Sequence, residues 1–147
     1  MIWMLIAALA LGLLLIAVIS ADQSKKPKKR NGKRRYANRI GSVDKEFVQT
    51  RWVAIEGMAS GGGSLRDAVS EADKLVDYVL KQSGVPGETM GERLKSGGDR
   101  FSDINAIWRA HKLRNALAHE AKFDLVPSMA REAIADFRQG LKDLGAL

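Results

Sequence analysis

The chain has no cysteine, two histidines and only three prolines in 147 residues. The absence of cysteine excludes a disulfide scaffold and any chemistry that depends on a thiol. The histidines, His111 and His119, are eight residues apart, which is about 12 Å along a helix, so they cannot share one metal ion. No glycine-rich phosphate loop follows a strand pattern, and no nucleophile elbow is present. The sequence therefore predicts neither a metal site nor a bound cofactor.

Acidic residues are nearly absent from the first 35 residues, where Asp22 is the only one. The same region carries eight basic residues in one short run: Lys25, Lys26, Lys28, Lys29, Arg30, Lys33, Arg34 and Arg35. Residues 36–147 contain 16 basic and 16 acidic residues, so the net charge of +7 comes entirely from this basic run and its neighbour Asp22. RNA-binding domains usually carry a basic face, so the formal neutrality of residues 36–147 does not favour RNA binding by this part of the chain.

Residues 1–19 contain no charged side chain, and Gly12 is the only one that is neither strongly apolar nor alanine. As a helix they span about 28 Å, close to the roughly 30 Å hydrocarbon core of a bilayer. A cleaved signal peptide is the alternative, but the basic n-region is missing and Ile19-Ser20-Ala21 is a poor cleavage site. We expect residues 1–21 to be an uncleaved, single-pass anchor in the cell membrane. The positive-inside rule then places the N-terminus outside and the remaining chain in the cytoplasm.

Residues 22–38 are rich in Lys, Arg, Pro, Asn and Gly and have no apolar periodicity, which predicts a basic juxtamembrane linker. In one interpretation the positive charge of the linker sets the orientation of the anchor in the membrane and has no other role. The other interpretation is binding, either to anionic lipid, at about 1 kcal/mol per base near the surface, or to RNA phosphate.

Apolar periodicity predicts helices through residues 39–147. The first begins near Ile40 and ends at the glycine-rich segment before Ser64. Its apolar face holds Val43, Phe47, Ala54 and Met58, widened by Val48, Trp52 and Ile55. The second helix begins at a capping box that spans Ser64 and Asp67, and Gly84 and Pro86 stop it. Its unbroken stripe consists of Leu65, Ala68, Val69, Ala72, Leu75, Val76, Val79 and Leu80. Asp73 and Asp77 are assigned to its exposed side.

Three further helices follow. A second capping box, with Thr89 and Glu92, opens a short helix that carries Leu94. A long helix extends from about Ser102 to Ala121, and the last begins at Pro127. The last helix has one apolar side: Ala130, Ala133, Ile134, Phe137, Leu141 and Leu144. No segment alternates with period two. The expected fold is all-α, a four- to five-helix bundle over residues 39–147, preceded by a single transmembrane helix.

The long helix holds both histidines. On a helical wheel Ile104, Trp108, His111 and Asn115 fall within about 60° of one another, with His119 just beside them. This stripe is apolar at its start and polar toward its C-terminal end. Such a polar end is typical of a functional site, and equally of a bundle that buries a few hydrogen-bonded side chains.

Four residues separate Arg114 from His119, and the polar Asn115 directly follows the arginine. This Arg-x4-His arrangement on a late, long helix resembles the signature of HEPN domains (higher eukaryotes and prokaryotes nucleotide-binding), which are compact α-helical bundles. In many members the arginine and histidine belong to a ribonuclease that works without metal at a cleft between two subunits, whereas others are inactive binding modules. The resemblance implies Arg114, Asn115 and His119 as catalytic residues, a homodimer, and RNA as the substrate. Trp108 and His111 are the expected supporting residues.

A further variant of the signature has a tyrosine two residues after the histidine. That position is Ala121 here, so regulation through such a tyrosine is not implied.

Five residues on a helix correspond to 500°, so Arg114 and His119 point about 140° apart. Two copies related by a dyad near Asn115 would place one subunit's histidine beside the other's arginine. A histidine ordinarily titrates near about pH 6.5 and can take or return the proton of a 2′-hydroxyl. An arginine fork can hold the phosphate as its charge grows.

A purely structural role is the alternative for the same residues. Arg114 then pairs with Glu120 or Asp124, and His119 simply ends the helix, where the dipole favours a cation. His111 and Asn115 are then satisfied polar residues of the core, next to Trp108.

Two functions follow from these interpretations. The first is a membrane-tethered, metal-independent ribonuclease of defence or toxin type. The second is a non-catalytic helical bundle that binds a protein or nucleotide partner at the membrane, and the neutral charge of residues 36–147 favours it.

Overall fold

The computed structural model describes residues 43–120 and 122–147. Within these ranges every regular element is a helix and there is no strand. Four helices are long and one is short: α3 (Lys45–Gly57), α4 (Leu65–Gln82), α5 (Met90–Gly97), α6 (Ile104–His119) and α7 (Pro127–Asp143). The prediction of an all-α bundle with four long helices and one short helix is confirmed for this part of the chain.

The expected anchor (residues 1–21) and the basic linker (residues 22–38) lie outside the described residues. The expectation that the first helix includes Val43 is wrong, because Asp44 caps α3 and the helix begins at Lys45. Among the residues that are described, no helix is both long enough and apolar enough to cross a membrane.

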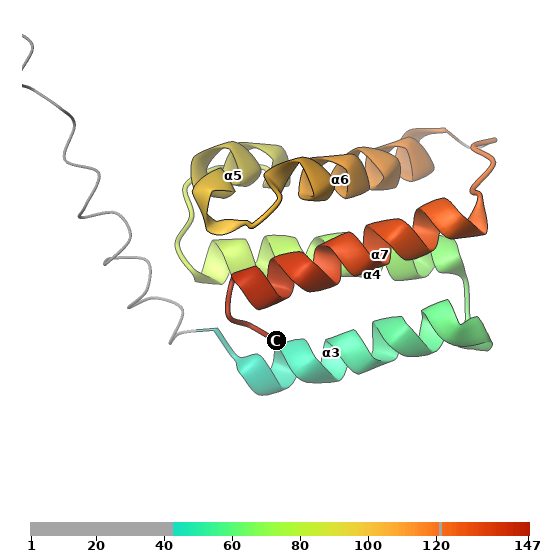
Figure 1. Ribbon diagram of the computed structural model, residues 1–147, viewed down its shortest axis with the longest axis horizontal. Coiled ribbons are helices and arrows are strands. Elements are labelled where there is room, and N and C mark those ends of the chain that lie inside the picture. Colours follow the sequence, from blue (N-terminus) through green and yellow to red (C-terminus); the bar gives the residue numbers. More distant parts are fainter. Residues whose placement is uncertain (1–42, 121) are drawn as a thin grey trace, which may run out of the picture. The chain divides into compact units, whose positions relative to one another are not determined.

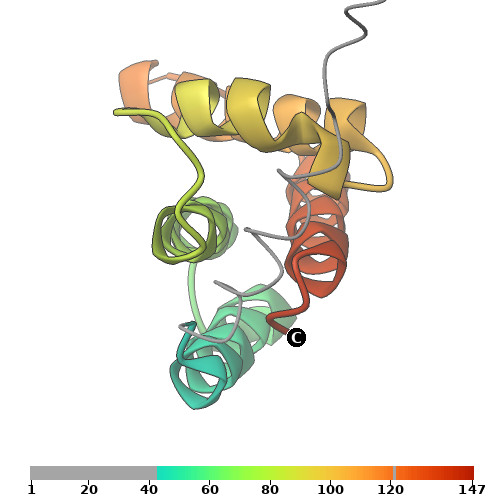
Figure 2. The ribbon, with the colours of Figure 1, turned by 90° about the vertical axis from the view of Figure 1, so that its left-hand side faces the viewer.

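The long helices form an up-down-up-down bundle. Helices α4 and α7 lie next to each other in the middle, with α6 on one side of this pair and α3 on the other (Figures 1 and 2). Helices α3 and α6 run in one direction, and α4 and α7 in the other (Figure 1). The short helix α5 lies on α4, beside the start of α6. Helix α4 therefore contacts every other helix of the bundle.

Side chains cap the helices where the sequence predicts it. Ser64 Oγ accepts a hydrogen bond from the N–H of Asp67 at 3.4 Å, and Thr89 Oγ1 accepts one from the N–H of Glu92 at 3.2 Å. In the capping box of α5 the carboxylate of Glu92 also accepts a hydrogen bond from the N–H of Glu88, one residue before the cap Thr89, at 2.7 Å. Each capped N–H is one that the helix itself leaves without a partner.

Two helices end on a glycine in the left-handed region. Gly84 follows α4 with φ +69°, and Gly145 follows α7 with φ +70°. After α4 the N–H of Val85 donates to the carbonyl of Leu80 at 3.0 Å, and the same pattern closes α7. This arrangement satisfies carbonyls at the helix end, and it favours glycine because a Cβ is strained there.

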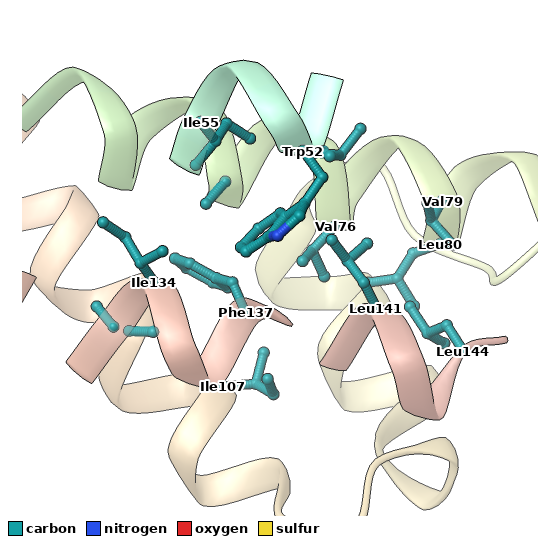
Figure 3. Close-up of a cluster of buried hydrophobic side chains, with 14 of the residues drawn as sticks. Trp52, Ile55, Val76, Val79, Leu80, Ile107, Ile134, Phe137, Leu141 and Leu144 are labelled. Atoms are coloured by element: carbon teal, nitrogen blue, oxygen red, sulfur yellow. The ribbon is translucent and has the colours of Figure 1, made fainter. Parts of the chain in front are cut away.

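The core lies between α4 and α7 and extends to both outer helices. Trp52 of α3 points toward Phe137 of α7 and Val76 of α4, and Ile107 of α6 approaches the same region from the other side (Figure 3). A Cβ on Gly140 of α7 would lie 2.7 Å from Cδ1 of Ile107, so glycine allows α6 and α7 to approach closely. The stripes predicted for α4 and α7 are buried, except for Leu65, which is half-buried.

The apolar face predicted for the first helix is wrong in part. Val48, Trp52 and Ile55 are buried, whereas the Phe47 side chain is 41% exposed and Ala54 is exposed. The reason is that α3 lies at the edge of the bundle, where a narrow stripe with spacings of four and three residues is sufficient.

Phe137 and Phe47 differ in burial, so the same substitution at the two positions should have different effects on stability. Phe137 is fully buried, so Phe137→Ala should lower the free energy of unfolding of the full chain by about 3–5 kcal/mol. Phe47→Ala, the same substitution at an exposed position, should cost less than about 1.5 kcal/mol, mainly through its contact with Tyr78. Urea unfolding followed by circular dichroism measures both. Equal losses for the two variants would contradict the observed packing of α3.

The segment before α6 is tied to the end of α7. Asp143 accepts hydrogen bonds from the N–H and O–H of Ser102 at 2.7 and 2.6 Å, and one from Gln139 at 2.9 Å. The side chain of Asp103 caps the helix, so α6 begins at Ile104 and not at Ser102. Burial raises the pKa of the Asp143 carboxyl, but the three hydrogen bonds outweigh it and hold that pKa below its usual value.

A carboxyl with a lowered pKa in the folded state stabilises the fold above its unfolded pKa of about 3.9, and this stabilisation disappears as the pH falls through the folded value. Asp143→Asn should therefore reduce stability more at pH 6 than at pH 3. Urea unfolding of the parent and the variant at both values measures the difference. A loss that is constant or that grows with acid would show that the hydrogen bonds of Ser102 do not favour the ionised form.

Candidate functional site

The polar stripe of α6 turns toward a single carboxylate on α4. Asp73 is only 3% exposed, and each of its oxygens has a partner on α6. Oδ1 lies 2.7 Å from Nδ1 of His111, and Oδ2 lies 3.3 Å from Nε of Arg114. His111 is itself 8% exposed. One buried acid thus holds the histidine and the arginine together.

Asn115 closes these contacts into a ring. Its Nδ2 lies 3.2 Å from Nε2 of His111, and its Oδ1 accepts a hydrogen bond from Nη1 of Arg114 at 3.1 Å. We call the four residues Asp73, His111, Arg114 and Asn115 the polar ring. Three hydrogen bonds and one ion pair connect them in a closed sequence.

The polar ring determines where the proton of His111 lies. An arginine has only donors, so the amide atom that faces Arg114 must be the oxygen of Asn115. Its other amide atom, the nitrogen, is a donor and faces Nε2 of His111. Nε2 must then accept, which leaves the hydrogen on Nδ1, where it donates to Asp73. The ring is complete only with His111 in this neutral form.

A second ion pair lies close to the ring. Arg93 of α5 donates to both oxygens of Asp77, at 2.7 and 3.0 Å, and to the carbonyls of Gly87 and Glu88. These contacts fasten the loop before α5 to α4. The hydrogen bonds to Asp77 raise the pKa of Arg93 above its usual value, although its burial acts the other way.

The polar ring and the Arg93–Asp77 pair line the same open cavity of about 470 Å³ between α4, α5 and α6. The exposed side chains of Lys74, Glu88 and Thr89 complete its rim. The charged side chains of the lining are three bases and three acids. Glu88 is the one acid of the three whose carboxylate forms no ion pair or hydrogen bond with a described residue. Asp73 and Asp77 are already engaged, so the groups left for a ligand at the inner wall are mainly donors.

The assignment of Asp73 and Asp77 to an exposed face is wrong. Asp73 is buried and Asp77 is half-buried, and both meet cations or donors of neighbouring helices. The sequence does contain a signal for Asp73, because it lies in the row Val69, Asp73, Val76, Leu80, whose other members are fully buried. A charged residue in such a row needs a partner on the facing helix.

His119 lies apart from the polar ring. It is the last residue of α6, it is exposed, and no described residue forms a hydrogen bond or ion pair with its side chain. The helix thus ends at His119, as the structural alternative expected, and not at Ala121. It is not among the residues that line the cavity with Arg114 and Asn115, so one copy of the chain does not unite Arg114 with His119.

Arg66 of α4 holds the segment on either side of His119. Its Nη1 donates to the carbonyl of Leu117 at 2.6 Å, and its Nη2 donates to the carbonyl of Phe123 at 3.0 Å. The interaction satisfies a carbonyl at the end of α6 and fixes the direction in which the chain leaves it. This cap could not be predicted from local spacing, because Arg66 is 51 residues from Leu117.

The contacts expected from the structural alternative are found for His111, but not for Arg114, and Asn115 is half-buried and not part of the core. His111 and Asn115 are hydrogen-bonded to each other, and the ring of Trp108 lies edge-on to His111 with centroids 5.9 Å apart. The expected partner of Arg114 was Glu120 or Asp124, and its observed partner is Asp73. Trp108 itself is half-buried, because its stripe lies at the side of α6 that faces α5.

Arg93 and Arg51 give a second matched prediction. Arg93 is 6% exposed and bonded to a carboxylate and two carbonyls, so Arg93→Ala should cost about 1.5–3 kcal/mol or more of stability. Arg51 pairs with Glu71 at the surface, at 3.4 Å, and Arg51→Ala should cost less than about 1 kcal/mol. Urea unfolding of both variants measures the two losses. Similar small losses would mean that the Arg93–Asp77 pair does not hold α5 in place.

The residues that the structure describes include no group of three His, Asp or Glu side chains placed to bind a metal ion. Comparison of this chain with protein-family models, with curated proteins and with solved structures gave no match. What the polar ring and His119 do is therefore inferred from their contacts, their exposure and their chemistry.

Proposed function

We propose that this chain is a membrane-tethered ribonuclease of the HEPN type, in which Arg114, Asn115 and His119 act at a site shared by two copies. The observation that carries the proposal is how the guanidinium of Arg114 is held and which of its atoms has no acceptor. Asp73 and Asn115 hold its guanidinium at the wall of an open cavity, and no described residue accepts a hydrogen bond from its Nη2. A guanidinium held in this way is prepared to bind a phosphate oxygen.

The exposure of His119 supports the second half of the proposal. An imidazole without a described partner at the end of a helix is free to exchange a proton with a bound molecule. Arg66 holds the backbone at the end of the helix through its contact with the carbonyl of Leu117, two residues before His119.

A dimer is required because one copy separates the two residues. A twofold axis near Asn115 brings His119 of one copy toward Arg114 of the other and creates two equivalent sites. The partly exposed side of α6 that carries Arg114 and Asn115 belongs to the surface that would meet its symmetry mate.

The proposed reaction uses the RNA itself as the nucleophile. His119 removes the proton of a 2′-hydroxyl, whose oxygen attacks the adjacent phosphorus while the bond from phosphorus to the 5′-oxygen breaks. Arg114 stabilises the extra negative charge on the phosphoryl oxygens. The 5′-oxygen takes up a proton from water as it leaves, and His119 returns the proton that it removed to the solvent, so the products are a 2′,3′-cyclic phosphate and a 5′-hydroxyl. No step of this sequence requires a metal ion.

The segments before the bundle complete the proposal. Residues 1–21 anchor the chain with its bundle in the cytoplasm, and the basic run from Lys25 to Arg35 attracts either anionic lipid or RNA. Because residues 36–147 carry equal numbers of acids and bases, a non-catalytic bundle that binds a protein or nucleotide partner at the membrane is the second candidate.

The test is cleavage of labelled RNA by the purified full chain in detergent micelles, with and without EDTA. The parent should produce cyclic-phosphate ends in both cases. Arg114→Ala and His119→Ala should each lower the rate by at least about 100-fold, and a mixture of the two variants should regain part of it through one rebuilt site. Arg109→Ala, which removes an exposed arginine of the same helix, is the matched control and should retain activity.

Two results would decide against the ribonuclease. A parent protein that is dimeric and leaves RNA intact from pH 6 to pH 8 favours the binding module. Cleavage that survives in both single variants would show that the activity belongs to a contaminant or to other residues.

A further inference from the structure

The neutral form of His111 is built into the polar ring, and this has a consequence for Arg114. In the ring Asn115 donates to Nε2 of His111 with its nitrogen and accepts from Arg114 with its oxygen. An imidazolium carries a hydrogen on both nitrogens, so a proton added to Nε2 would face the donor nitrogen of Asn115. Two donors cannot share a hydrogen bond.

Only a rotation of the amide restores a bond to a protonated His111. The oxygen of Asn115 then turns to Nε2, and its nitrogen turns to Arg114. Because Arg114 has no acceptor, it loses its bond to Asn115 and keeps only the ion pair with Asp73. An asparagine with one donor and one acceptor cannot satisfy Arg114 and a charged His111 together.

We propose that His111 and Asn115 are positioning residues for Arg114 and that they hold its guanidinium in place only while His111 is neutral. That Arg114 contacts RNA phosphate rests on the proposed function, whereas the coupling between His111 and Arg114 rests on the ring alone. In the ribonuclease, protonation of His111 would loosen the phosphate-binding residue. Cleavage would therefore decline once His111 is protonated.

Other charged groups also face the cavity and must be separated from this effect. They are Asp73, Lys74 and Asp77 on α4, Glu88 and Arg93 at α5, and Arg114 on α6. On α7 the nearest acids to α6, Glu132 and Asp136, line a different hollow together with Arg109. The Arg93–Asp77 pair is an internal control, because it is an arginine–carboxylate pair in the same cavity and no described histidine contacts it.

The experiment is a pH titration of the full chain in detergent micelles by NMR, with histidine and arginine labelled with nitrogen-15. His111 is assigned in the His119→Ala variant, in which it is the only histidine. At high pH it should be in the form with hydrogen on Nδ1. As it becomes protonated, the Nε signal of Arg114 should shift with the same midpoint, whereas the Nε signal of Arg93 should stay in place.

The variant Asn115→Asp tests whether the Arg114 signal shifts because the hydrogen bond from Arg114 to residue 115 is lost, or only because His111 gains a charge nearby. A carboxylate accepts from both neighbours, so it can hold Arg114 and a charged His111 at the same time. In this variant His111 should still titrate, and the shift of the Arg114 signal should be lost. His111→Gln is the second variant, because glutamine cannot titrate, and it too should abolish the shift.

Several results would overturn the inference. They are a hydrogen on Nε2 of neutral His111, an Arg114 signal that ignores the titration of His111, and a shift that persists unchanged in Asn115→Asp. The RNA assay decides separately on the proposed function. If the NMR coupling is found and the parent does not cleave RNA, the ribonuclease fails and the positioning of Arg114 by the ring stands.

Discussion

The buried carboxylate of Asp73 is the constraint on which the middle of the bundle depends. An ionised acid removed from water is costly unless its oxygens are engaged, and here the engagement is complete, with His111 on one oxygen and Arg114 on the other. Both partners belong to α6, so the carboxylate fixes how α6 lies along α4. A shift of α6 by one turn would leave Asp73 facing other side chains. Apolar contacts supply most of the stability of such a bundle, but they specify this alignment less strictly.

Asp73 is one of three points at which the same side of α4 holds a neighbouring segment. Arg66, Asp73 and Asp77 follow one another at spacings of seven and four residues, which keeps them on one face of the helix. Arg66 caps the end of α6, Asp73 holds its middle, and Asp77 fastens α5 through Arg93. The apolar face beside this row of polar residues belongs to the core, where α4 contacts α7. The apolar face of α4 thus stabilises the bundle through packing, and the polar face orients the segments that carry the proposed site.

The difference between these two faces explains what the sequence could predict. The caps at Ser64 and Thr89 and the stripes of α4 and α7 follow from local spacing, and they were predicted correctly. The partner of a buried charge is not local, since Asp73 and His111 are 38 residues apart. A helical wheel assigns a lone carboxylate to solvent, so the polar face of α4 was missed. The motif at Arg114 was found, but its ion pair with Asp73 required the structure.

The polar ring also limits what the bundle can contribute to RNA binding. Asp73 and Arg114 cancel formally, the ring is complete only with a neutral His111, and residues 36–147 carry no net charge. Affinity for a nucleic acid grows with the number of phosphates that basic residues neutralise. Residues 36–147 have no net charge to attract phosphates, whereas the run from Lys25 to Arg35 has eight basic residues. Arg114 is held in direction by Asp73 and Asn115. In the proposed ribonuclease the two tasks are therefore divided. The basic run would gather RNA near the membrane, and the ring would set the geometry at the phosphate to be cleaved.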